Sequence, residues 1–134
     1  MTTLFPAQIY KQIAITSASP GQLVLMLLDG ALRFTGQAIE GLDNPDFIRS
    51  QEICHNNILR TQSIVAELQG TLDFEKGGQL ASVLFRIYDY LLLQLHEANE
   101  NKTKDPLLNV IRYVDEIRSA WATMLAAQGT SEPA

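Results

Sequence analysis

The chain has 134 residues, and its ten Lys and Arg residues against fifteen Asp and Glu residues leave a formal net charge of -5. Proteins that bind nucleic acid cluster basic residues against the phosphates, so an acidic chain with scattered basic residues argues against a nucleic-acid partner. Hydrophobic residues make up 46% of the chain and charged residues 19%, which is typical of a globular protein. The length fits one domain with a core of its own.

Signals for export or membrane insertion are missing from the sequence. Residues 1–6 have neither the basic region nor the long apolar stretch of a signal peptide. The longest apolar run, residues 23–28, is far shorter than the roughly 20 residues that a membrane helix needs. Cys54 is the single cysteine, which excludes an intramolecular disulfide and suits a reducing compartment. We therefore expect a cytoplasmic protein without membrane insertion.

The first predicted helix begins at a capping motif. Ser19 is a favoured N-cap residue, Pro20 suits the first helical position, and Gln22 stands three residues after the cap. Serine and glutamine at this spacing form a capping box, which satisfies backbone N–H groups that the helix cannot pair internally. The apolar positions that follow extend the helix to about Asp43.

A second cap-and-proline signal, Asn44–Pro45, predicts the start of the second helix. Apolar or small residues then alternate three and four positions apart as far as Leu72. This spacing is typical of a helix with one buried face.

The third predicted helix follows a break at residues 73–78, where Gly77 and Gly78 are poor helix-interior residues. Its leucines share a stripe over residues 80–98. A polar connection at residues 99–104 then leads to Asp105–Pro106, which predicts the start of a fourth helix.

The four predicted helices have similar lengths. Three of about 22 to 27 residues span roughly 33–40 Å each, and the fourth matches them. Equal helices joined by short turns predict an all-α, antiparallel up-and-down four-helix bundle. The expected organisation is an apolar N-terminal arm at residues 1–18, the bundle at residues 19–128, and a flexible tail at residues 129–134.

Two helices carry more apolar side chains than a bundle core needs, which is about three positions in seven. Residues 23–28 are apolar right round the helix, and the third helix adds Val83, Tyr90 and Leu93 outside its main stripe. One explanation is a helix that is central or lies under a loop. The other is a surface groove covered by a partner or by the N-terminal arm.

The N-terminal arm is itself apolar, and we expect it to dock on the bundle. It is either packed there permanently or displaced by a competing ligand. Its apolar residues are Leu4, Phe5, Ile9, Tyr10, Ile13 and Ile15.

Residues that could carry chemistry do not assemble into a recognisable site. Glu52 and His55 match the Glu-x-x-His motif of ferritin-like di-metal bundles, but the other histidine, His96, lacks a glutamate three residues before it. Histidine phosphotransfer domains are also small bundles, yet neither histidine has the Lys-Gly neighbourhood familiar in that group. This class of protein stays open as an alternative. Cys54 and Trp121 lie on apolar stripes and are predicted to be core residues. We expect no catalysis, no metal and no cofactor.

Three features of the chain together resemble one family. They are Ala-Ser-Pro-Gly-Gln-Leu through Leu-Leu-Asp-Gly at residues 18–30, Glu-Lys-Gly-Gly followed by Tyr-Asp-Tyr within residues 72–99, and the late Trp121. In order and spacing they resemble the FliS family of flagellar export chaperones. Two departures are Leu28, where the family often has an aromatic residue, and Leu-Leu-Leu-Gln at residues 91–94, where it has a more polar and basic stretch.

The resemblance implies a four-helix bundle that binds the disordered C-terminal segment of flagellin in the cytoplasm. It also implies that binding prevents premature polymerisation and helps to present flagellin to the flagellar type III export gate. Tyr10 matches a tyrosine in the family's N-terminal arm that is linked to partner and export-gate contacts.

The predicted partner-binding residues come from the arm, from the outward side chains of residues 23–28 and from the third helix. The alternative function is a helical adaptor or regulator of flagellar assembly that self-associates through the same surface, and we expect a monomer or a weak homodimer. The predicted residues are Tyr10, Ile13, Ile15, Leu23, Leu27, Val83, Tyr90 and Leu93.

Overall fold

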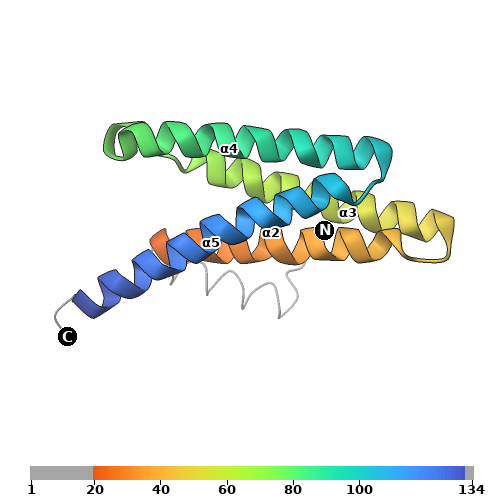
Figure 1. Ribbon diagram of the computed structural model, residues 1–134, viewed down its shortest axis with the longest axis horizontal. Helices are drawn as coiled ribbons and strands as arrows, with labels where there is room; N and C mark the ends of the chain where they lie inside the picture. The colour runs from red at the N-terminus through yellow and green to blue at the C-terminus, as the bar shows by residue number, and fades with distance from the viewer. Residues whose placement is uncertain (1–19, 132–134) are drawn as a thin grey trace, which may run out of the picture.

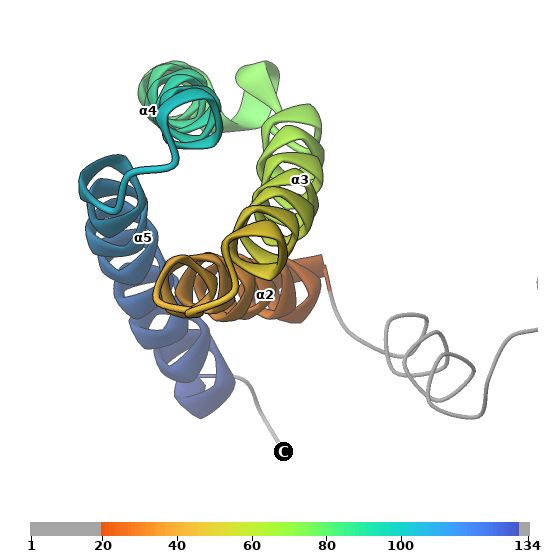
Figure 2. The same cartoon turned by 90° about the vertical axis from the view of Figure 1, so that its right-hand side faces the viewer.

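The computed structural model describes residues 20–131, which form a bundle of four α-helices (Figure 1). The chain reverses direction at each short connection, so consecutive helices are antiparallel. Helix α2 packs against α3 and α5, and α4 packs against the same two helices from the opposite side (Figure 2). The all-α four-helix bundle predicted from the sequence is confirmed. Its helices are α2 (Pro20–Leu42), α3 (Phe47–Gly70), α4 (Phe74–Asn101) and α5 (Asp105–Ser131).

Helix α3 starts two residues later than the cap-and-proline signal predicted. Asp46 is the N-cap, because its Oδ1 accepts a hydrogen bond of 3.2 Å from the backbone N–H of Arg49. The Oδ1 of Asn44 accepts a hydrogen bond of 2.9 Å from the N–H of Asp46 instead. Asn44 and Pro45 therefore form the turn before the helix, a role that suits both residue types.

The predicted break at residues 73–78 is narrower in the structure. Asp73 caps α4, since its Oδ1 accepts hydrogen bonds from the N–H groups of Glu75 and Lys76, both at 3.0 Å. One helical turn follows before Gly78, whose backbone is at φ 50° and ψ -123°. Positive φ favours glycine because it has no Cβ to clash. Gly78 is therefore the point at which the helix is interrupted.

The last connection is also shorter than predicted. Lys102 ends α4 in the left-handed conformation, and its backbone N–H donates a hydrogen bond of 2.7 Å to the carbonyl of Ala98. The first helical bond of α5 joins the N–H of Leu108 to the carbonyl of Lys104 at 2.9 Å, so Asp105 lies inside the helix. At its other end α5 continues to Ser131, beyond the boundary expected at residue 128. Alanine and glutamine at residues 126–128 favour this continuation.

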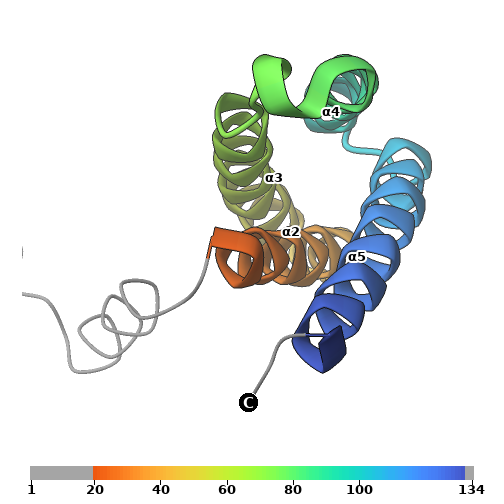
Figure 3. The same ribbon diagram turned by 90° about the vertical axis from the view of Figure 1, so that its left-hand side faces the viewer.

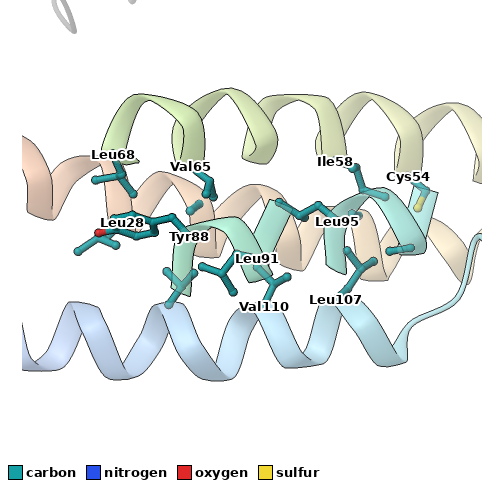
Figure 4. Packing of buried hydrophobic residues seen from close by; sticks show 14 residues of the cluster. Leu28, Cys54, Ile58, Val65, Leu68, Tyr88, Leu91, Leu95, Leu107 and Val110 are labelled. Atoms are coloured by element: carbon teal, nitrogen blue, oxygen red, sulfur yellow. The ribbon is translucent and has the colours of Figure 1, made fainter. Parts of the chain in front are cut away.

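The hydrophobic core follows the axis of the bundle, with each helix contributing residues three, four or seven positions apart (Figure 4). This spacing aligns the buried side chains on the inner face of each helix. The buried members are Leu28, Ala31, Ala38, Cys54, Ile58, Val65, Leu68, Tyr88, Leu91, Leu95, Ala98, Leu107, Val110 and Val114.

Two threonines bring hydroxyl groups into the contact between α2 and α3. The Oγ1 atoms of Thr35 and Thr61 lie 3.3 Å apart. Each also donates to a carbonyl one turn earlier in its own helix, that of Ala31 at 2.6 Å and that of Asn57 at 3.1 Å. Because buried hydroxyls with partners cost little, these residues are compatible with the core.

Candidate functional site

One end of the bundle carries an apolar cavity of about 390 Å³, which we call the end pocket. The start of α2, the connection between α3 and α4, the first turns of α4 and the later part of α5 meet at this end (Figure 3). Leucine, tyrosine and tryptophan make up half of the residues that line it. Its apolar side chains are Leu23, Val24, Leu27, Leu72, Leu80, Ala81, Leu84, Tyr88 and Trp121.

Trp121 holds two walls of the end pocket together. Its indole Nε1–H donates a hydrogen bond of 2.8 Å to the backbone carbonyl of Gly21. This hydrogen bond joins α5 to the first turn of α2. A Cβ on Gly21 would lie 2.5 Å from Cδ2 of Leu125, so the glycine permits this close approach of α5. The half-buried indole thus has a bonded N–H and an apolar face in the pocket wall.

A second hollow, the α2/α3 groove, has a volume of about 610 Å³. Leu23 and Leu27 line both this groove and the end pocket. The two hollows therefore adjoin at these two leucines, and we call the apolar side chains that line them the apolar surface. The groove is lined by Leu23, Met26, Leu27, Asp29, Gly30, Arg33, Phe34, Arg60, Ser63 and Ile64.

The carboxylate in the groove lining is already bonded within the bundle. Oδ1 of Asp29 accepts a hydrogen bond from Nε of Arg118 on α5 at 2.5 Å. This hydrogen bond, with the charges of Asp29 and Asp115, raises the pKa of the Arg118 guanidinium. The ion pair joins α2 to α5 beside the apolar surface and neutralises the charge of Asp29.

The structure separates the predicted partner-binding residues into two groups. Leu23 and Leu27 lie together in the shared wall of the two hollows. Val83, Tyr90 and Leu93 are exposed on α4, and none of the three lines either hollow. The ring of Tyr90 instead packs edge to face against the ring of Tyr113 on α5, with the two ring centroids 5.3 Å apart. The predicted arm residues Tyr10, Ile13 and Ile15 lie outside the described residues.

Sequence reasoning missed several residues that line the two hollows. Trp121 packs against the hydrophobic core, as predicted, but it also lines the end pocket, and Phe34 lines the α2/α3 groove. Leu72 was placed at the end of the α3 stripe and lies in the connection that borders the pocket. One feature of the sequence could have pointed to the end pocket. Leu72 and Leu80 lie beside predicted helix ends, where the core of a bundle is not covered by a further turn of helix.

The histidines, the cysteine and the glutamate considered for chemistry, His55, His96, Cys54 and Glu52, line neither hollow. His55 is exposed, with Nδ1 at 3.1 Å from Oδ1 of Asn99. Cys54 is fully buried, and this desolvation raises the pKa of its thiol. Within residues 20–131 no three His, Cys, Asp or Glu side chains are grouped so as to hold a metal ion. No helix in the same range has the length and apolarity needed to cross a membrane.

Comparison with known proteins gives consistent matches along the chain. Residues 4–128 match the family described as flagellar protein FliS. The flagellar secretion chaperone FliS of Bacillus subtilis is 32% identical over 123 residues, covering 92% of this chain and 88% of the relative. The flagellar secretion chaperone FliS of Salmonella typhimurium is 34% identical over 115 residues, covering 86% and 83%. That of Campylobacter jejuni is 34% identical over 112 residues, covering 84% of each chain. The chain therefore belongs to the FliS family of flagellar secretion chaperones.

Proposed function

We propose that this protein binds the disordered C-terminal segment of flagellin in the cytoplasm. Binding keeps the segment from polymerising prematurely and aids its delivery to the flagellar type III export apparatus. The observation that carries the proposal is the apolar surface of the end pocket and the α2/α3 groove, which share Leu23 and Leu27. Such a surface in a member of a chaperone family suits a client that exposes apolar side chains when unassembled.

The shape of this surface suits an amphipathic helix. A helix laid in a groove presents apolar anchors at positions i, i+3, i+4 and i+7 on one side. The adjoining hollows offer places for successive anchors on either side of Leu23 and Leu27. Folding of a disordered client on binding costs about 2–5 kcal/mol or more of the interaction free energy, so the complex stays reversible. Reversible binding suits a client that must be released for export, and it requires no catalysis or cofactor.

The N-terminal arm belongs to the proposed mechanism because of its position in the chain. The arm ends just before Pro20, a residue that lines the end pocket. We infer that Ile13 and Ile15 contact the apolar surface in the absence of a client and are displaced by it. Tyr10 is proposed to contact the client or the export gate.

The exposed residues of α4 favour a second candidate function, a self-associating adaptor. Leu93 is 61% exposed, and Val83 and Tyr90 are exposed on the same helix. A second copy of the chain would cover these side chains and form a weak homodimer. In the chaperone proposal, the same residues extend the contact with flagellin around the bundle.

Calorimetric titration with a peptide matching the C-terminal segment of the same organism's flagellin tests the proposal. Saturable one-to-one binding with a large negative heat-capacity change is expected, because apolar surface is buried. Trp121 is the only tryptophan and lines the end pocket, so its fluorescence gives a second readout of occupancy. A scrambled peptide of the same composition is the control. Absence of binding by a folded, monodisperse sample would refute the proposal, and concentration-dependent sedimentation would then support the adaptor.

A further inference from the structure

Two arginines at one end of the α2/α3 groove have no internal counter-ion in the part of the chain that the structure describes. The Cζ atoms of Arg33 and Arg60 lie 4.9 Å and 5.5 Å from the ring centroid of Phe34. None of the ion pairs found among residues 20–131 involves either guanidinium. Asp29, the carboxylate nearest to them in the groove lining, is bonded to Arg118. Two positive charges therefore stand beside an apolar surface in a chain whose net charge is -5.

The apolar surface ends at these arginines. From Leu23 to Phe34 the outward side of α2 lines the end pocket and the groove. The next hollow along α2 is lined mostly by polar residues, among them Gln37, Glu40 and Asp43, and Asp43 is paired with Lys104. A bound segment that entered from the end pocket would meet the guanidinium groups at the end of its apolar track. Continuing further would place it against polar side chains and the carboxylate of Glu40.

We propose that Arg33 and Arg60 bind the terminal carboxylate of the client, so that the client chain ends beside Phe34. This inference rests on the proposed function and specifies how the client is oriented. A guanidinium presents N–H groups in a fork that fits a carboxylate, and the ring of Phe34 shields one side of each group from water. The C-terminal end of a bound helix also carries about half a negative charge, which adds to the attraction.

The proposed site gives the client a direction. Its C-terminus lies toward the middle of α2, and the preceding helical turns lie toward the end pocket. The client helix then runs parallel to α2 and antiparallel to α3. Because both arginines are exposed, the contribution is screened by salt and is expected to be about 3- to 10-fold in affinity at low ionic strength.

The test compares the flagellin C-terminal peptide as the free acid with the same peptide amidated at its C-terminus. Both are titrated into the full-length protein and into the Arg33→Gln/Arg60→Gln double variant. Arg86→Gln is the matched control, since Arg86 is an exposed arginine on α4 outside both hollows. We expect amidation to weaken binding 3- to 10-fold for the wild type and Arg86→Gln, and to have no effect on the double variant. Far-UV circular dichroism checks that each variant is folded.

Three outcomes separate this inference from the proposed function. Equal binding of acid and amide by the wild type would overturn the terminal-carboxylate site and leave the flagellin client in place. If the double variant lost affinity equally for both peptides, the arginines would act through a client side chain or through Phe34, and the inference would again be wrong. Failure of both peptides to bind the wild type would instead remove the proposed function and this inference with it.

Discussion

Leu27 and Leu28 are adjacent in α2 but have different surroundings, so truncating each to alanine should separate client binding from stability. Leu28 is fully buried in the core, whereas Leu27 is half-buried and lines both hollows. Leu28→Ala leaves a cavity and should lower the free energy of unfolding by about 2–5 kcal/mol. Leu27→Ala removes three carbon atoms, worth about 2.4 kcal/mol if fully buried. With half of that burial present in the free protein, about 1.2 kcal/mol falls on stability and about 1.2 kcal/mol on client affinity.

The affinity loss for Leu27→Ala corresponds to roughly an eightfold rise in Kd. Urea denaturation followed by circular dichroism measures the free energy of unfolding, and calorimetry with the flagellin peptide measures Kd. Leu28→Ala should bind as the wild type does under conditions in which it stays folded. The reasoning fails if Leu27→Ala leaves Kd unchanged, or if both variants lose stability and affinity to the same extent.

Three further predictions follow from the backbone and the buried titratable groups. Gly78→Ala should lower the free energy of unfolding by about 1–3 kcal/mol, because alanine is strained at φ 50°. Gly36→Ala, whose added Cβ meets no atom within 4 Å, should raise the free energy of unfolding by about 0.5–1 kcal/mol. If urea denaturation showed a change of the same sign for both glycine variants, the strain inferred at residue 78 would be contradicted. Burial raises the pKa of Tyr88, so its contribution to stability is complete below the ordinary value of about 10 and declines as pH rises above it. Between pH 8 and 11 the free energy of unfolding should therefore fall less steeply with pH for Tyr88→Phe than for the wild type. Parallel curves of free energy against pH would refute this. Cys54 should react slowly with a thiol reagent in the native protein and rapidly in urea, since it is buried and its thiol pKa is raised; fast native labelling would show that α3 is open at this point.

Local sequence signals predicted the number and type of the helices well because they depend on neighbouring residues. The three- and four-residue spacing of apolar positions defines a helix face, and Asp, Asn and Pro mark turns. The same signals placed the helix starts less well. Asn44, Asp46 and Asp73 are all good capping residues, and the backbone geometry of each turn selects which one accepts the N–H groups.

The candidate site was predictable only in part. The surplus of apolar residues in residues 23–28 drew attention to Leu23 and Leu27, and both line the two hollows. The equal surplus on α4 gave no way to tell that Val83, Tyr90 and Leu93 lie on a different face. Periodicity assigns a residue to one side of its own helix, but it carries no information on which neighbouring helix lies beside it.

By itself the sequence determined an all-α bundle of four antiparallel helices and a strong resemblance to a chaperone family, because helix periodicity, turns and motifs are local properties. Only the tertiary structure decided that residues far apart in the chain meet. It brought Trp121 to Gly21 and closed the end pocket, and it brought Arg60 of α3 to the ring of Phe34, beside Arg33. These contacts depend on how the helices are rotated and spaced, which is set by the packing of the whole core at once.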